Sequence, residues 1–208
     1  MENLLASMPG IWRPLAALIL ASVVIMGSPG PSTISVTAVG AAHGVRRSLG
    51  YACGLIAGTI AVLLMASMGV VALVASVPHG ARVLGVLSAA YILYLAFRIA
   101  TAPPLGDQRR ALTAPAFAGG FLLAIANPKA YLAIGAVLAG TTVIAGHQGL
   151  DAIVKIAVLS AMIAVIHLCW LLAGVSLSRF LHDPVSSRLI NVSMAAILVA
   201  MTLAALMH

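Results

Sequence analysis

The sequence predicts an all-α integral membrane protein with six transmembrane helices, arranged as two inverted repeats of three helices. Hydrophobic residues make up 62% of the 208 residues and charged residues only 7%, whereas soluble domains carry roughly a quarter charged residues. Two proline-containing breaks, Ser28-Pro29-Gly30-Pro31 and Asn127-Pro128-Lys129, lie in corresponding apolar runs of the two halves. Breaks in this arrangement mark the binding site in transporters that are built from inverted repeats.

The apolar runs predict six spans, at roughly residues 14–41, 48–76, 82–101, 114–146, 152–177 and 187–207. A spanning helix needs about 20 mostly apolar residues. Helices are expected rather than barrel strands, because the runs lack the alternation of polar and apolar residues that barrel strands show. The first and fourth spans, which contain the breaks, are longer than one crossing needs. Each is either one broken helix or more than one membrane segment, including a re-entrant piece.

The first break interrupts helical hydrogen bonding inside the span 14–41. Pro29 and Pro31 each lack a backbone N–H, and a proline inside a helix costs about 3 kcal/mol or more in water. Gly30 between them gives the backbone freedom to turn. In a membrane, the freed backbone groups must face protein or a water-filled cavity. A plain proline kink is the alternative, but the matching break in the other half favours a binding site.

A half-helix that begins after the first break would start near Ser32 and Thr33. The first N–H groups of a helix are unpaired, and its N-terminal end carries a partial positive charge. Such an end binds anions, including a substrate carboxylate. The Ser32 hydroxyl has a second possible role as the helix cap.

The span 48–76 carries a small-residue face at Gly50, Gly54 and Gly58. Small residues at this spacing let the backbones of two membrane helices approach closely. The pattern predicts packing, either within the subunit or across a homodimer. The sequence leaves both open.

The span 82–101 is followed by the polar stretch 102–110, which divides a single transmembrane domain into halves at approximately 1–104 and 112–208. Three spans per half is an odd number, so the second half must be inverted relative to the first.

The second break places a cation inside the span 114–146. Lys129 lies between uncharged runs of 18 and 21 residues, and a lysine at such a position marks a functional site by default. It is expected either to pair with a substrate carboxylate or to bind the carbonyls that the break frees. The alternative is that the flanking runs are two short segments, with Lys129 near the membrane interface.

The span 152–177 contains His167 near its middle. Imidazole gains and loses a proton near neutral pH, so His167 is the candidate for proton coupling. The alternative is a neutral histidine that bonds to a neighbouring helix. Trp170 and Tyr131 are expected to pack or to line the path.

The four carboxylates are expected in termini or loops, at Glu2, Asp107, Asp151 and Asp183. Coupling through a buried acid is therefore not expected. Histidines and carboxylates do not cluster into metal-ligand sets, and no nucleophile with a positioned base is evident. We expect no metal, no cofactor and no enzymatic activity.

Loop charges predict the orientation and explain the net charge of +7. Seven arginines lie in the loops after the first, third and fifth spans: Arg46, Arg47, Arg98, Arg109, Arg110, Arg179 and Arg188. Three basic residues lie on the opposite side: Arg13, Arg82 and Lys155. The positive-inside rule places the first set in the cytoplasm and both termini outside. Binding of nucleic acid is not expected, because the charges form no basic face.

Several of these motifs together resemble the lysine-exporter (LysE/RhtB-type) amino-acid efflux family. The resemblance rests on Ser28-Pro29-Gly30-Pro31, Gly40, Gly44, Arg46-Arg47, the Gly50, Gly54, Gly58 face and Asn127-Pro128-Lys129-Ala130. It implies export of amino acids or close derivatives across a bacterial-type inner membrane, driven by the proton gradient. Many members have Asp where this chain has Ser32, so the proton-carrying carboxylate is missing here. Many members also continue the second motif into an aromatic-rich stretch with another proline, whereas residues 131–135 of this chain read Tyr-Leu-Ala-Ile-Gly.

Our leading hypothesis is a secondary exporter of small neutral amino acids, with its site between the two breaks. The expected substrate-binding residues are Pro29, Gly30, Pro31, Ser32, Thr33, Asn127, Pro128 and Lys129. The half-helix at Ser32 and Lys129 would hold the carboxylate, and Asn127 with freed carbonyls would hold the ammonium group. The rivals are a transporter of an inorganic ion or small anion, a membrane-embedded enzyme and a scaffold without transport.

Overall fold

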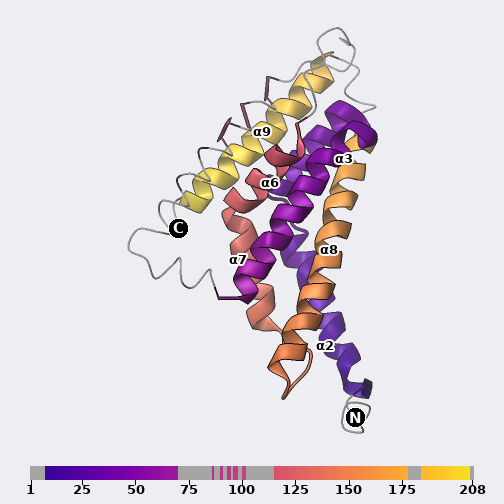
Figure 1. The fold of residues 1–208 in the computed structure, drawn as a ribbon. Coiled ribbons are helices and arrows are strands. Elements are labelled where there is room, and N and C mark those ends of the chain that lie inside the picture. Colours follow the sequence, from indigo (N-terminus) through magenta and orange to yellow (C-terminus); the bar gives the residue numbers. More distant parts are fainter. Residues whose placement is uncertain are drawn as a thin grey trace.

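The computed structural model describes residues 8–69, 115–177 and 184–206, and single residues at 86, 90, 93, 94, 96, 97, 100 and 101. Within these ranges there is no strand (Figure 1). The elements are α2 (Met8–Ala21), the π-helix η1 (Ser22–Met26), α3 (Pro31–Ser67), α6 (Phe117–Ala126), α7 (Pro128–Gly140), α8 (Gln148–Leu177) and α9 (Pro184–Leu206). The expected third span, 82–101, and the polar stretch after it fall outside the continuous ranges.

Three parts of the described chain are long and apolar enough to cross a membrane. The helices α3 and α8 qualify alone, and α6 with α7 qualifies as one span bent by 62° at its break. Large apolar side chains such as Trp12 and Leu132 are 73% and 74% exposed, as expected for surfaces that face lipid. These observations agree with an integral membrane protein.

The helix α3 is a hairpin of two limbs that turns at Gly44. The φ angle of Gly44 is 73°, a conformation that glycine adopts without steric cost. The Ser48 hydroxyl bonds to the carbonyls of Val39 and Gly44 across the turn. Ser35 in the first limb contacts the Tyr51 hydroxyl in the second, so the two limbs lie side by side. The turn falls between the ends expected for the first two spans, at residues 41 and 48.

Small residues set the distances between α3 and its neighbours. A Cβ at Gly54 would lie 2.0 Å from the Phe117 carbonyl oxygen in α6, and one at Gly120 would lie 2.2 Å from the Tyr51 oxygen. On the other limb, a Cβ at Gly174 of α8 would lie 2.1 Å from the Thr37 oxygen. Most of the glycine face expected for the second span therefore packs inside the subunit.

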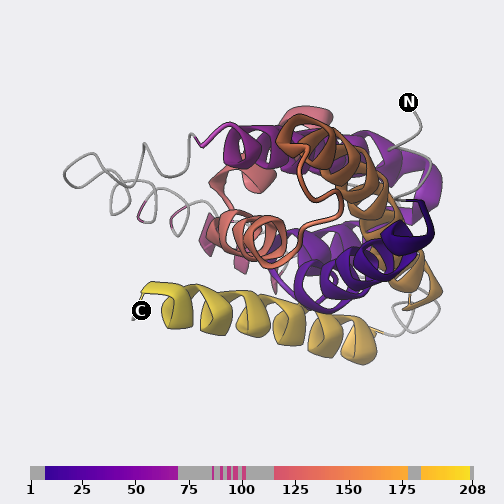
Figure 2. The same cartoon turned by 90° about the horizontal axis from the view of Figure 1, so that it is seen from below.

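The bundle is built around α3, with α8 along one side and α6 and α7 on another (Figure 1). Figure 2 shows α9 on the outside of the bundle. Two apolar clusters fill the interior. One contains Tyr51, Leu55, Leu123 and Leu171, and the other contains Leu18, Leu63, Ile134, Leu159 and Ile163.

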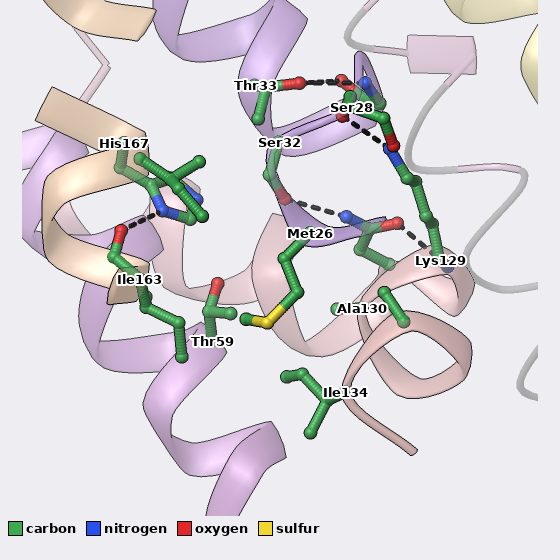
Figure 3. A pocket seen from close by; sticks show the side chains of 14 residues that line it. Met26, Ser28, Ser32, Thr33, Thr59, Lys129, Ala130, Ile134, Ile163 and His167 are labelled. Atoms are coloured by element: carbon green, nitrogen blue, oxygen red, sulfur yellow. Dashed lines mark hydrogen bonds between the residues drawn. The ribbon is translucent and has the colours of Figure 1, made fainter. Parts of the chain in front are cut away.

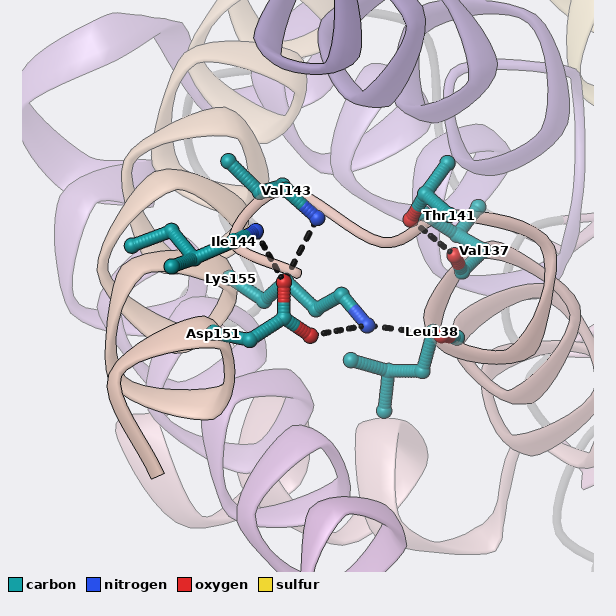
Figure 4. A network of polar contacts seen from close by, with 7 residues as sticks. All are labelled: Val137, Leu138, Thr141, Val143, Ile144, Asp151 and Lys155. Carbon is teal, nitrogen blue, oxygen red and sulfur yellow. Dashed lines mark hydrogen bonds and ion pairs between the residues drawn. The ribbon is translucent and has the colours of Figure 1, made fainter. Parts of the chain in front are cut away.

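A buried ion pair lies where α7 connects to α8. One prediction from the sequence was wrong here. Asp151 was expected in a loop, but α8 begins at Gln148, so Asp151 lies in its first turn and is only 9% exposed. Its Oδ2 is 2.8 Å from the Lys155 ammonium. Its Oδ1 accepts the N–H groups of Val143 and Ile144 (Figure 4).

Lys155 completes this network by donating to the Leu138 carbonyl near the end of α7, at 3.1 Å. Each buried charge therefore has several partners, which is the condition under which a buried pair is tolerated. Because the Asp151 oxygens bond to Lys155 and two backbone N–H groups, we assign the pair to holding the two helix ends together.

Replacing Gly54 by Val should lower the thermal unfolding midpoint of the purified protein in detergent. Overpacking of a tight contact costs roughly 1–3 kcal/mol. Gly50→Val is the matched control on the same face, because a Cβ at Gly50 meets nothing within 4 Å. Equal midpoints for the two variants would contradict this packing.

Asp151→Asn should also lower the unfolding midpoint, because it leaves the Lys155 ammonium buried without its counter-ion. Removing one partner of a buried pair typically costs about 3–5 kcal/mol. The double variant Asp151→Asn, Lys155→Met should regain part of that loss, since no unpaired charge is left. Additive losses in the double variant would show that the two side chains do not act as a pair.

Candidate functional site

The two breaks meet in the interior of the protein. The Asn127 side-chain nitrogen donates a hydrogen bond to the Ser32 hydroxyl oxygen at 2.8 Å, across 95 positions of sequence. Pro31 begins α3 and Pro128 begins α7, and proline suits this first helical position because its missing N–H would be unpaired there anyway. Two half-helices therefore start beside each other.

At the start of α3, the Thr33 side chain bonds back to Gly30, which is the N-cap residue. The N–H of Gly30 donates to the Thr33 hydroxyl oxygen at 2.8 Å, and this hydroxyl lies 3.1 Å from the Gly30 carbonyl. The Ser32 hydroxyl does not cap the helix and instead accepts the bond from Asn127. Among the described residues, the N–H groups of Ser32 and Thr33 have no hydrogen-bond acceptor.

The start of α7 is capped by Asn127. Its Oδ1 accepts the Lys129 N–H at 3.1 Å, while its nitrogen donates to Ser32. An amide side chain has both a donor and an acceptor. Asn127 can therefore cap its own helix and bond to the other half-helix at once.

Lys129 binds the carbonyls that the first break frees. Its ammonium lies 2.5 Å from the Ser28 carbonyl oxygen, 2.8 Å from the Ser28 hydroxyl and 2.7 Å from the Pro29 carbonyl oxygen. An ammonium has three donors, so these oxygens use all of them. A Cβ on Gly30 would lie 2.7 Å from the Lys129 Cδ, so glycine makes room for this side chain.

The break thereby separates donors from acceptors. In an unbroken helix the Ser28 and Pro29 carbonyls would accept from the N–H groups of Ser32 and Thr33, four residues on. Lys129 supplies the carbonyls with new partners, but the two N–H groups stay available. These donors at a helix start are suited to a carboxylate.

Other carbonyls beside the breaks are also bonded by side chains. The Trp170 indole donates to the Gly27 carbonyl at 3.1 Å. The Tyr131 hydroxyl donates to the Ile125 carbonyl at 2.8 Å. Neither ring lies among the residues that line the cavity, so Trp170 and Tyr131 support the broken backbone.

A cavity lies between the two breaks, α8 and the second limb of α3. Its volume is about 40 Å³, which is enough to hold water. Figure 3 shows the polar groups of the two breaks gathered on one side, with His167 on another. The lining residues are Met26, Ser28, Gly30, Ser32, Thr33, Thr59, Asn127, Lys129, Ala130, Ala133, Ile134, Ile163, Ile166 and His167.

His167 lines the cavity from α8 and is only 5% exposed. Its Nδ1 lies 2.8 Å from the Ile163 carbonyl oxygen of the same helix. Its Nε2 is buried and has no hydrogen-bond partner among the described residues. Leaving a buried polar atom unpaired costs about 1–3 kcal/mol, so a partner from the cavity would be favoured.

The expected site is thus largely assembled in one place. Gly30, Ser32, Thr33, Asn127 and Lys129 line the cavity together with His167. Pro29, Pro31 and Pro128 do not line it; they shape the backbone beside it. Thr59, whose hydroxyl bonds to the Leu55 carbonyl, also lines the cavity and was not predicted. Its polar side chain near the middle of the apolar span 48–76 was the available signal.

The cavity lining combines hydrogen-bonding groups with apolar side chains. The fourteen lining residues include no carboxylate and no cysteine. No group of three or more His, Cys, Asp or Glu side chains that could hold a metal occurs in the part of the chain that the structure describes.

Comparison with known proteins decides the family. The family model described as LysE type translocator matches residues 23–208, which include both breaks and every lining residue. The chain belongs to the LysE type translocator family. It is therefore a membrane translocator and not an enzyme, as the resemblance in its motifs implied.

Individual LysE-type relatives agree with this assignment. The chain is 31% identical over 186 residues to a "Cysteine/O-acetylserine efflux protein" of Escherichia coli strain K12 and to one of Shigella flexneri, covering 89% of this chain and 93% of each relative. A protein of that name from Escherichia coli O1:K1 / APEC is 31% identical over 187 residues, with the same coverage. No solved structure matches. The bacterial relatives and the apolar helices indicate a multi-pass inner-membrane protein.

Lys129→Ala should abolish transport while the protein stays inserted in the membrane. The Ser28 and Pro29 carbonyls would lose their partner, and each hydrogen bond to a charged group is worth about 1.5–3 kcal/mol. We therefore also expect a lower unfolding midpoint. Lys129→Arg, which keeps a cationic donor, is the control and should retain part of the activity. Wild-type efflux in Lys129→Ala would remove this residue from the mechanism.

Proposed function

We propose that this LysE-type translocator exports small neutral amino acids or their close derivatives from the cytoplasm, driven by the proton gradient. The cavity between the two breaks is its substrate site. The observation that carries the proposal is the meeting of two half-helix starts at a cavity that offers the free N–H groups of Ser32 and Thr33. The relatives named for efflux of cysteine and O-acetylserine support the substrate class.

The carboxylate of the substrate binds at the start of α3. Two backbone N–H groups without a described acceptor converge there, and the partial positive charge of a helix start favours an anion. Lys129 contributes by holding the adjacent carbonyls away from the carboxylate rather than by pairing with it, because its three donors are used. Binding of the freed carbonyls is one of the two roles that the sequence suggested for Lys129, whereas our leading hypothesis used this lysine for the carboxylate.

The side chain of the substrate is small and uncharged. The part of the cavity away from the breaks is lined by Met26, Ala130, Ala133, Ile134 and Ile163. No lining carboxylate is present to pair with a lysine or arginine substrate, and an unpaired buried charge is costly.

A cavity of about 40 Å³ is narrow for an amino acid, so substrate entry requires the site to widen. Met26 is a flexible side chain that extends into the cavity beside Thr59 (Figure 3), and it can move aside. The π-helix η1 lies directly before the first break, and π-helical segments are frequent at functional sites.

The finer architecture belongs to the same proposal. Six spans in two inverted halves would let one half rock against the other around the fixed site, with both termini outside the cytoplasm. His167 carries the proton, because Lys129 is the only other titratable side chain in the cavity lining and its donors are already bonded. A homodimer stays a prediction, since Gly54 and Gly58 pack within the subunit.

The second candidate is a transporter of an inorganic ion or small anion. The small cavity volume and the two N–H donors favour it. A small anion would need only the start of α3 and would leave the apolar wall and the His167 Nε2 without a partner. For this reason we rank it below amino-acid export.

Cells that express the protein should release one or a few neutral amino acids selectively. We would score efflux of the twenty amino acids and O-acetylserine against cells with Lys129→Ala, at matched amounts of inserted protein. Uptake into inside-out vesicles should depend on an imposed proton gradient and collapse with a protonophore. If labelled chloride or phosphate moves and no amino acid does, the inorganic-ion candidate replaces this proposal.

A further inference from the structure

The hydrogen-bonding pattern of His167 determines which ring nitrogen carries its hydrogen. Nδ1 lies 2.8 Å from the Ile163 carbonyl oxygen, and a carbonyl only accepts. Nδ1 must therefore be the N–H donor. In a neutral imidazole the other nitrogen then presents a lone pair, so Nε2 is an acceptor that is buried beside the cavity without a described partner.

The other strong acceptors around the cavity are already engaged. The Asn127 Oδ1, which the sequence suggested for binding the ammonium group, already accepts the Lys129 N–H, so one of its two lone pairs is used. The Ser28 and Pro29 carbonyls bind the Lys129 ammonium. Among the lining side chains, the His167 Nε2 is the most basic atom left over, since the Thr59 and Ser32 hydroxyls are weak bases.

The charge balance of the cavity makes this lone pair sensitive to protons. Of the lining residues that α3, η1, α7 and α8 contribute, only Lys129 and His167 titrate, and no carboxylate faces them. A proton on Nε2 removes the lone pair and adds a positive charge in a site without a counter-ion. Both changes oppose the binding of an ammonium group.

We propose that the His167 Nε2 lone pair accepts a hydrogen bond from the ammonium group of the substrate, and that a proton competes with the substrate for it. This inference rests on the function proposed above. The zwitterion is held at both ends, with its carboxylate at the N–H groups of Ser32 and Thr33 and its ammonium group at Nε2.

Competition at the His167 Nε2 couples the inward movement of protons to the outward movement of amino acids. Facing outside, the site takes up a proton at Nε2 and releases the amino acid. Facing the cytoplasm, it loses this proton and binds the next amino acid. One proton enters for each zwitterion that leaves, so one positive charge moves inward per cycle.

The wild-type protein provides a test that does not depend on any variant folding. In detergent or proteoliposomes, binding of reduced L-cysteine would be compared with binding of 3-mercaptopropionate, which lacks the ammonium group. Between about pH 5 and 8, where imidazole charge changes, the apparent Kd for cysteine should rise on the acid side by up to about tenfold per pH unit, as competition by one proton requires. The Kd for 3-mercaptopropionate should not rise.

Variants of His167 then test separately its role as a hydrogen-bond acceptor and its role as the proton-binding group. His167→Gln keeps an acceptor that does not titrate, so it should exchange cysteine across the membrane without pH dependence and without proton-driven accumulation. His167→Leu has no acceptor and should bind cysteine no better than 3-mercaptopropionate. The exposed His147→Gln is the matched control and should keep the wild-type pH dependence.

The outcomes distinguish this inference from the function on which it rests. If cysteine is transported but His167→Gln keeps proton-driven accumulation, or if acid weakens 3-mercaptopropionate binding equally, the role of His167 is overturned and amino-acid export stands. If the wild-type protein neither binds nor transports cysteine or any other amino acid, both are overturned.

Discussion

The requirement that every buried backbone polar group find a partner in a membrane governs this structure. The break before Pro31 frees carbonyls on one side and N–H groups on the other. Lys129 satisfies the carbonyls from the opposite half of the chain, and the N–H groups of Ser32 and Thr33 are left beside a cavity. A backbone that could not continue as a helix thus leaves donors beside the cavity that we propose as the substrate site, because one set of freed groups has a protein partner and the other does not.

Close packing of α3 against its neighbours brings Lys129 and Asn127 beside the first break. The hairpin turn at Gly44 lays its two limbs together, and glycines at α3, α6 and α8 let backbones approach to distances that a Cβ would prevent. Asn127 can reach Ser32 only because α6 and α8 are held against the same hairpin. The buried pair of Asp151 and Lys155 bonds to the far end of α7. The half-helix α7, which follows the second break, is therefore held at both of its ends.

Much of the site follows from local sequence rules. Prolines without N–H groups predict the breaks at residues 28–31 and 127–129, and the structure has half-helix starts at both. The lysine and histidine inside apolar runs line the cavity as expected. The sequence did not predict that the first break takes up all three Lys129 donors, that Thr33 bonds back to Gly30 while Ser32 bonds to Asn127, or that Asp151 is buried. These depend on which groups approach one another, and periodicity carries no such information.

The sequence by itself determined that this chain lies in a membrane, where its helices break and which family it belongs to, because apolarity and missing N–H groups are properties of the residues alone. Only the tertiary structure decided how each freed group is used. The same Lys129 ammonium could have faced a substrate or a carbonyl, and the same His167 could have bonded on either nitrogen. The role of Lys129 depends on hydrogen bonds of about 3 Å or less, which exist only after segments about a hundred residues apart have packed together. The bond of His167 lies within α8, but only the tertiary structure places its other nitrogen beside the cavity.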